Sequence, residues 1–519
     1  MGHDMLTPPD STPSTPAKSR FQDLEEPISS PVLSAPATSY SHSLLGVADN
    51  LTSTVASAVF SLGFPPALTG ARMAILKAMS HAITWGQLVI ETGDERHVFP
   101  SPSKRSELGL GEFEGQAVIV RVLQDTFWLR LVTLGDLGFA ESYMAGECEV
   151  SDLAGVFKIF IKSKPHETAN SISGVTTLSS RAMSLFTSIT NSRFANTLSN
   201  SVSNIRAHYD LSNGMFSSFL SRDMTYSCGI FPELDRDLER KKGLANGYRE
   251  GVDELEEAQL AKIRHIIRKA DIRPGHRVLE IGSGWGSFAI EAVQTTGCTV
   301  DTITLSSQQK ALAEKRVKAA GLAGRIRVWL MDYRALPDSW KGAFDRVVSI
   351  EMLEAVGKEF IPGYFGVIDS ALNATGAACI QVITIPESRF EQYQKQVDFI
   401  QKWIFPGGFL PTVTYTIESI QKGAKNRLVV DSISNIGPHY ARTLREWSER
   451  FHVNFDEKIA PALKLEHPEM SDEDVEVFRR KWNYYFCYCQ VGFSERVLGD
   501  HIITMVREGN ADYGCTTFE

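Results

Sequence analysis

The chain has 519 residues, of which 43% are hydrophobic, and a formal net charge of −9. This length gives two or three domains with buried cores, and the acidic balance, with no long Lys/Arg block, argues against a nucleic-acid partner. The seven cysteines form no CxxC pair and no Cys/His spacing suited to zinc, so we expect free thiols in a reducing compartment and no bound metal.

Residues 1–68 are expected to form a tail of low order, because the first 40 of them are rich in Ser, Thr and Pro and poor in large apolar side chains. The tail has no signal-peptide pattern. No tract in the chain approaches the ~20 apolar residues that span a bilayer. We therefore expect a cytoplasmic protein that is at most peripherally associated with membranes.

Residues 69–165 are predicted to form a small α+β domain. A helical pattern begins near Arg72, and the apolar helix 153–163 ends the domain. Between them lie strand-like runs at 90–99, 115–123 and 126–133, followed by a helical segment at 134–147. The Ser/Thr-rich residues 166–204 then predict a linker or an insertion.

Residues 205–519 show strands that alternate with helix-length segments. Helix 254–270 leads, through a Pro-Gly turn, to a short apolar strand at 278–281. The alternation continues with helices at 286–296 and 307–320 and with strands at 299–305, 325–331, 344–350 and 377–385. Such alternation predicts an α/β domain with a mostly parallel sheet and helices on both faces.

A glycine-rich turn at 282–286 separates the first strand from its helix, at the sheet edge where open α/β folds bind ligands. Its G-x-G-x-G spacing lacks the third glycine of a dinucleotide site, and the second strand ends in Thr304 and Ser306 instead of an acid. No Gly-Lys-Ser/Thr follows, so a phosphate-binding loop is excluded. A glycine-rich turn alone is weak evidence, because it could equally be merely a tight turn.

Four segments identify a family that this chain resembles: VLEIGSGWGSFAIEAV, TITLSSQQ, MDYRALP and SIEMLEAVG. In this order and spacing they resemble the cyclopropane-fatty-acid synthases, most closely the plant-type and other eukaryotic members. The resemblance covers about 205–508, and residues 133–147 resemble the smaller N-terminal domain of full-length members. It implies a Rossmann-like class I S-adenosylmethionine methyltransferase domain with a smaller N-terminal α+β domain.

The resemblance also implies the activity. Family members transfer the methyl of S-adenosylmethionine to the cis double bond of an unsaturated acyl chain, here that of a membrane phospholipid. The resulting carbocation is deprotonated by a bound bicarbonate and closes to a cyclopropane. It gives a methyl branch if a different proton is lost and reduction follows.

The cofactor site is carried over by the resemblance, residue by residue. Tyr226 and Ser227 would close over the methionine end, Thr304, Leu305, Ser306 and Gln309 would line the ribose side, and Asp332 and Tyr333 would flank the adenine. The glycines that would cradle the cofactor are Gly282, Gly284 and Gly286. Structural alternatives stay open for two of these residues: Leu305 could be a core residue, and Ser306 a helix N-cap.

The catalytic site implied by the resemblance is a ring of polar groups around bicarbonate. Cys228 would donate its backbone N–H, and Glu354 and Tyr440 would complete the hydrogen bonds. Gln381 stands where bacterial members have an anion-holding histidine, and Ala355 replaces another histidine. Cys489 would form a wall of the site. The alternatives are a surface carboxylate for Glu354, a packed tyrosine for Tyr440 and a small buried hydrophobe for Cys489.

The expected partners are an unsaturated phospholipid and the membrane surface, with no nucleic acid, and a homodimer is left open. Two other functions remain: a sphingolipid or small-molecule C- or N-methyltransferase on the same fold, and a lipid-binding regulatory protein with a degenerate site. The sequence does not give the lipid headgroup, the position of the double bond or the type of product.

Overall fold

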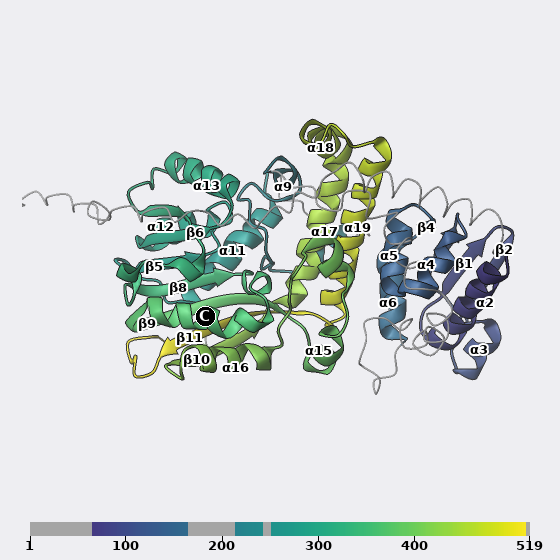
Figure 1. Cartoon of the computed structure of the whole chain (residues 1–519), viewed down its shortest axis with the longest axis horizontal. Helices are drawn as coiled ribbons and strands as arrows, with labels where there is room; N and C mark the ends of the chain where they lie inside the picture. The colour runs from purple at the N-terminus through teal and green to yellow at the C-terminus, as the bar shows by residue number, and fades with distance from the viewer. Residues whose placement is uncertain (1–64, 164–212, 242–250, 515–519) are drawn as a thin grey trace, which may run out of the picture.

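The computed structural model describes residues 65–163, 213–241 and 251–514, which form a small N-terminal domain and a larger α/β domain (Figure 1). The predicted tail, apart from its last residues, and the whole Ser/Thr-rich segment 166–204 lie outside the described residues. The first helix, α2 (Pro65–Ala82), begins earlier than the sequence pattern indicates.

The N-terminal domain is built on a four-stranded sheet with the order β2-β1-β3-β4. Its strands are β1 (Leu88–Thr92), β2 (Glu95–Phe99), β3 (Val118–Val122) and β4 (Cys148–Val150). Only β1 and β3 run parallel among its pairs. The remaining helices are α3 (Pro102–Glu107), α4 (Thr126–Leu134), α5 (Asp136–Met144) and α6 (Leu153–Lys162).

Helix α4 corrects the prediction of a strand at 126–133. Five consecutive residues from Phe127 to Leu131 are buried in this helix, including the Arg130 side chain. A helix covered on all sides has no polar stripe, so its sequence reads as a continuous apolar run, and such a run is also typical of a buried strand.

The larger domain contains a seven-stranded sheet with the order β10-β11-β9-β8-β5-β6-β7. Its strands are β5 (Arg277–Ile281), β6 (Thr299–Thr304), β7 (Ile326–Leu330), β8 (Phe344–Ile350), β9 (Leu372–Thr384), β10 (Leu428–Asn435) and β11 (Gly499–Arg507). Strands β5 to β9 pair in parallel, whereas β11 lies between β9 and β10 and is antiparallel to both. The mostly parallel sheet that the sequence predicts is confirmed.

Helices cover both faces of this sheet because its buried strands alternate their side chains between two apolar cores. Val278 belongs to one core, with α11 (Glu254–Lys269), α12 (Ser287–Thr296) and α13 (Ser307–Ala319). Leu279 belongs to the other, with α14 (Ile361–Ala371) and α16 (Val413–Gly423).

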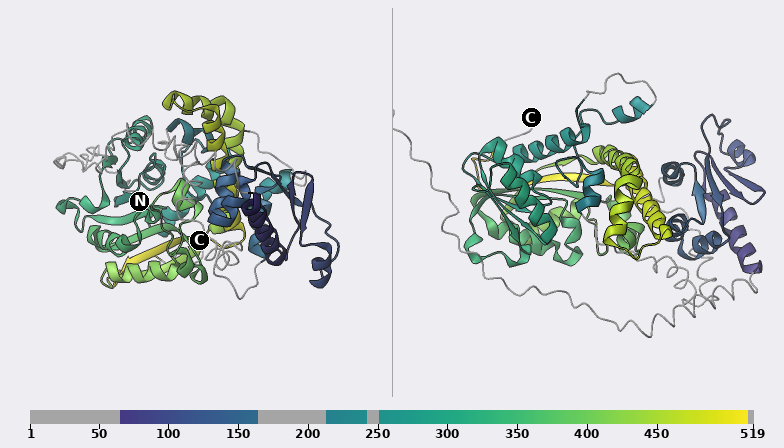
Figure 2. Two further views of the ribbon diagram at one scale, coloured as in Figure 1. Left: turned by 45° about the vertical axis from the view of Figure 1, so that its right-hand side comes forward. Right: turned by 90° about the horizontal axis from the view of Figure 1, so that it is seen from above.

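Two long helices, α17 (Gly437–Asn454) and α19 (Asp472–Ser494), lie between the large sheet and the N-terminal domain (Figures 1 and 2). Helix α19 joins the two domains: its Asn483 Nδ2 donates to Tyr143 Oη at 2.6 Å. A buried carboxylate of the small domain, Glu141, pairs with Lys402 of the large one at 2.7 Å. Within the described ranges, no helix is long and apolar enough to cross a bilayer.

Candidate active site

A cavity of about 410 Å³ opens at the carboxyl edge of β5, β6 and β8. The glycine-rich turn after β5 forms one wall, the segment Met224–Ser227 forms another, and the end of β6 forms a third. The buried side chains of Lys262 and Glu280 and the half-buried Glu351 also line it. The site therefore lies where open parallel sheets place their ligands.

Two positions of the turn, 282 and 284, require glycine for different structural reasons. Gly282 has φ +99°, and a Cβ there would lie 2.3 Å from Met352 Cγ, so packing requires glycine at this position. Gly284 has φ +46°, and a Cβ there would meet no atom within 4 Å. Since Gly284 lines the cavity, the turn leaves room for a ligand to approach its backbone closely.

Most residues that the sequence assigns to the cofactor line this cavity: Tyr226, Ser227, Gly282, Gly284, Thr304, Leu305, Ser306 and Gln309. Leu305 is 72% exposed and is therefore not a core residue. Ser306 does cap α13, because its Oγ accepts from Gln309 N at 3.2 Å. A ligand that needs an apolar platform, hydroxyl groups and close backbone contact fits this lining, and the adenosyl group of S-adenosylmethionine has this chemistry.

The other assigned residues, Gly286, Asp332 and Tyr333, are not part of the cavity lining. Gly286 precedes α12 as its N-cap residue. Asp332 pairs with Arg334 at 2.6 Å, and the ring of Tyr333 packs against Tyr364 at a centroid distance of 4.8 Å. The assignment of Asp332 and Tyr333 to the adenine remains a prediction.

The carboxylate of Glu351 is the centre of a hydrogen-bonded cluster at the deep end of the cavity. Its Oε1 accepts from the backbone N of Cys228 at 2.8 Å and from Gln381 Nε2 at 2.7 Å. Its Oε2 accepts from the Tyr440 hydroxyl at 2.7 Å. Gln381 Nε2 also donates to Asp500 Oδ2 at 2.8 Å. The structure thus brings together Cys228, Gln381 and Tyr440, which the sequence assigns to an anion, around a carboxylate that the sequence analysis did not name.

Glu354 lies close enough to this cluster to interact electrostatically with Glu351, and its role in holding an anion remains a prediction. Its Oε1 accepts from the backbone N of Ile383 at 2.6 Å. In the part of the chain that the structure describes, no hydrogen bond joins Glu354 to Cys228, Gln381 or Tyr440. Two residues, Met352 and Leu353, separate Glu354 from Glu351, and the short turn Leu353–Ala355 directs Glu354 toward the end of β9. Both glutamates follow β8 at the ligand edge, so position after a strand is the only sequence signal, and it does not distinguish them.

Comparison with known proteins agrees with this geometry. The model of the mycolic acid cyclopropane synthetase family matches residues 196–501. The chain belongs to this family. Tuberculostearic acid methyltransferase UfaA1 of Mycobacterium tuberculosis is 35% identical over 393 residues, which are 74% of this chain and 82% of the relative. Cyclopropane-fatty-acyl-phospholipid synthase of Escherichia coli is 30% identical over 385 residues, 73% of this chain and 85% of the relative.

A solved structure of the cyclopropane synthase MmaA2 from Mycobacterium tuberculosis is 27% identical, with a TM-score of 0.46, and covers 59% of this chain and 98% of that one. As a member of the cyclopropane synthetase family, the protein is an S-adenosylmethionine-dependent methyltransferase that modifies lipid acyl chains.

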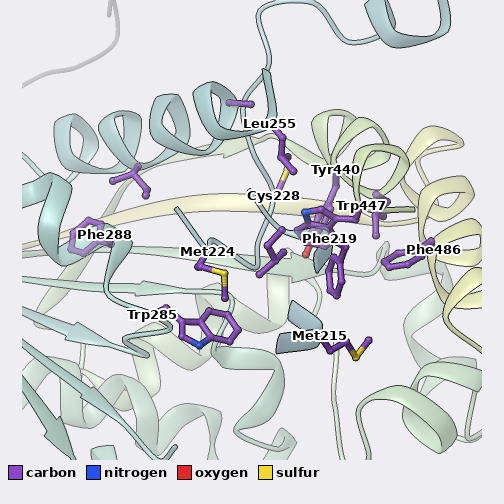
Figure 3. Close-up of a cluster of buried hydrophobic side chains, with 14 of the residues drawn as sticks. Met215, Phe219, Met224, Cys228, Leu255, Trp285, Phe288, Tyr440, Trp447 and Phe486 are labelled. Atoms are coloured by element: carbon purple, nitrogen blue, oxygen red, sulfur yellow. The ribbon is translucent and has the colours of Figure 1, made fainter. Parts of the chain in front are cut away.

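Aromatic side chains of this cyclopropane synthetase family member surround the carboxylate cluster. Figure 3 shows Tyr440, Trp447 and Phe219 beside Cys228. Tyr226 packs on Trp447 with ring centroids 5.0 Å apart, and its hydroxyl lies 3.1 Å from that of Tyr485. Aromatic faces attract cations, so this wall suits a cationic intermediate.

Cys489 lies on α19, near Tyr226 and Tyr485. Burial raises the pKa of its thiol well above the ordinary range. The thiol is therefore protonated at neutral pH and is a poor nucleophile. This state is compatible with the wall position that the sequence analysis assigned to Cys489.

The two carboxylates of the cluster, Glu351 and Asp500, are stabilised to different extents by their surroundings. Burial raises the pKa of both Glu351 and Asp500, and the nearby cation is Lys262, whose Nζ donates to Ser227 Oγ at 2.6 Å. Glu351 accepts three hydrogen bonds, which favour its charged form. Asp500 accepts one from Gln381 and is opposed by the charge of Glu351. The pKa of Asp500 is therefore raised further than that of Glu351, which is the better stabilised carboxylate of the two.

Bicarbonate does not fit this donor set, because all three expected donors already bind the Glu351 carboxylate. A second anion about 4 Å from that carboxylate would be repelled by about 4 kcal/mol at an effective dielectric constant of about 20. No step is therefore assigned to bicarbonate.

Glu280, at the end of β5, gives the first prediction. Burial raises its pKa to about 8, so the folded protein keeps a proton that the unfolded chain loses near its ordinary pKa. Stability should therefore fall as pH rises from about 5 to 8, by on the order of 1 kcal/mol for each pH unit. In Glu280→Gln this contribution should vanish. Urea unfolding of both proteins without cofactor checks it, and parallel pH profiles would contradict it.

Proposed function

We propose that this methyltransferase transfers the methyl of S-adenosylmethionine to the cis double bond of an unsaturated acyl chain in a membrane phospholipid. The product is a cyclopropane or methyl-branched fatty acid. The observation that carries the proposal is the direct junction between the cofactor-shaped cavity and the buried carboxylate cluster, with Glu351 belonging to both. The names of the relatives include both a cyclopropane synthase and a methyltransferase.

S-adenosylmethionine supplies an electrophilic methyl group when it is bound. The protein residues bind and orient the reactants: the glycine-rich turn and the segment Met224–Ser227 hold the cofactor, and the aromatic wall excludes water and stabilises positive charge. A buried carboxylate beside the reacting carbons then accepts a proton. Groups suited to cofactor binding, to stabilising positive charge and to accepting a proton are therefore all found in or next to the cavity.

An exposed aromatic residue supports contact with a membrane surface. Phe405 is 42% exposed, and its ring packs against that of Tyr485 at 6.1 Å. Tyr485 in turn contacts Tyr226 at the cofactor cavity. Through Tyr485, Phe405 thus connects the protein surface to the aromatic wall. A homodimer remains a prediction.

The second prediction tests the substrate. Full-length protein with methyl-labelled S-adenosylmethionine should label vesicles of a monounsaturated phospholipid and add one CH₂ to the unsaturated chain, as measured by mass spectrometry. Saturated vesicles are the control and should remain unlabelled, because only an alkene offers the π electrons.

Two other results would overturn this proposal. Labelling of sphingolipids or small amines without labelling of the phospholipid would favour the alternative methyltransferases. Lipid binding without any transfer would favour a regulatory protein, although the open Gly284 position and the intact polar cluster speak for an enzyme.

A further inference from the structure

We infer that the carboxylate of Glu351 takes the place of a bound anion in this enzyme and is itself the base that deprotonates the methylated acyl chain. The inference rests on the proposed function, because it concerns the second step of that reaction. It makes the base part of the protein chain instead of a dissociable ion.

The first support is the built and dry donor set. Gln381 is 1% exposed, Tyr440 is 5% exposed and Cys228 is fully buried. Their donors reach the two Glu351 oxygens at 2.7 to 2.8 Å from three separate elements. Preorganised donors of this kind hold a carboxylate in one orientation, and all three already donate to Glu351.

The second support is the backbone of Glu351, which has φ +49° directly after β8. A residue other than glycine rarely adopts this left-handed conformation, and it persists only where the surroundings enforce it. Here the backbone N of Glu351 donates to the carbonyl of Gln381 at 2.8 Å, while the side chain accepts its three hydrogen bonds. The strained conformation turns the carboxylate toward the donors, and strain of this kind is concentrated at functional sites.

The third support is position and charge. Glu351 lines the same cavity as Ser227 and Gly282, so it faces the space where the methyl group is transferred. Lys262 lies near enough to interact with the Glu351 charge, and Gln381 Nε2 bridges Glu351 and Asp500, so the negative charge of Glu351 is compensated within the site. Burial raises the pKa of Glu351, and a carboxylate with a raised pKa is a stronger base.

The step balances with these groups alone. The π electrons of the alkene form a bond to the methyl carbon, and the carbon–sulfur bond breaks to leave a neutral thioether and a carbocation on the acyl chain. The Glu351 carboxylate removes a proton from the added methyl. The electron pair of that C–H bond then closes the ring, and Glu351, now a neutral acid, releases its proton to solvent after the product leaves.

The third prediction uses two substitutions at this position, assayed on monounsaturated phospholipid vesicles in buffer freed of carbon dioxide. Wild type should keep its turnover there within about twofold, because its base is covalently attached. Glu351→Gln should lose a factor on the order of 10² or more, as for other lost preorganised polar groups. Glu351→Gly fits the left-handed backbone and empties the donor set, so added bicarbonate should restore its turnover by about tenfold or more through mass action.

Glu359→Gln is the matched control, since this exposed glutamate lies in the same loop and loses the same charge. It should behave as wild type. Circular dichroism should be unchanged in every variant, and each turnover is measured at an S-adenosylmethionine concentration that calorimetry shows to be saturating, which separates a lost base from a lost fold or a weakened cofactor site.

Wild-type activity that disappears without carbon dioxide and returns with bicarbonate would overturn the inference, as would near-normal turnover of Glu351→Gln. In both cases wild type still modifies the lipid, so the proposed function stands. Failure of the proposed function gives a different result, because wild type then makes no lipid product in any buffer.

Discussion

Replacement of Gly284 by valine is expected to weaken S-adenosylmethionine binding by a factor on the order of 100 or more, equivalent to at least ~2.7 kcal/mol. The added Cβ meets no protein atom within 4 Å, so the branched side chain occupies the cavity itself. The fold should persist, apart from a conformational cost of about 1–2 kcal/mol for a left-handed valine. Isothermal titration calorimetry measures the affinity, and circular dichroism measures the fold.

Gly297→Val is the matched control for this cofactor prediction. Gly297 also has a positive φ, +72°, and open space around its Cβ position, but it ends α12, away from the turn. It carries the same backbone cost without entering the cavity. Equal affinities of the two variants would contradict the assignment of the cofactor site.

Arg442→Met is expected to lower the free energy of unfolding by about 3 kcal/mol, because it removes a buried guanidinium from a network in which its carboxylate partners keep Arg240 and Arg445. The guanidinium is 1% exposed and bonds to Glu254, lies 3.7 Å from both Asp237 and Glu446, and stacks on the ring of Phe231 at 4.3 Å. These contacts tie the segment after Cys228 to the helix that carries Tyr440. Activity should therefore fall together with stability in urea titrations.

Arg222→Met provides the comparison for Arg442. Arg222 is 88% exposed and pairs with Glu256 at 3.2 Å, so its loss should cost no more than about 1 kcal/mol. A similar cost for the two substitutions would show that the buried network does not hold the two segments together.

The alternation of strands and helices could be predicted because the parallel strands are apolar runs bounded by turns, as at Val278 and Phe344. Strand β11 is also strongly apolar, but it follows the long helix α19 and breaks the alternation by running antiparallel, so its place in the sheet was not predicted. The prediction of a strand at α4 was wrong for a related reason. Because this helix is covered on all sides, its sequence lacks the periodic polar residues by which a helix is recognised.

The hydrogen-bond donors of the candidate site could be predicted from the sequence, but the carboxylate that accepts from them could not. The resemblance supplied Cys228, Gln381 and Tyr440, and the structure brings them together. The choice between Glu351 and Glu354 depends on which residue adopts the left-handed conformation after β8, and here it is Glu351. Local sequence does not encode that choice, because contacts from β9 and α17 enforce it.

The position of β11 has a consequence for the synthesis of this protein. Strands β5 to β9 can pair in the order in which they leave the ribosome, but β9 and β10 are not neighbours and must leave a gap for a strand made later. Until α19 and β11 follow, the long edge of β9 stays unpaired, and exposed apolar edges promote aggregation. The nascent enzyme is therefore prone to aggregation until β11 is synthesised and pairs with β9. That pairing also brings Asp500 to Gln381 and completes the carboxylate cluster.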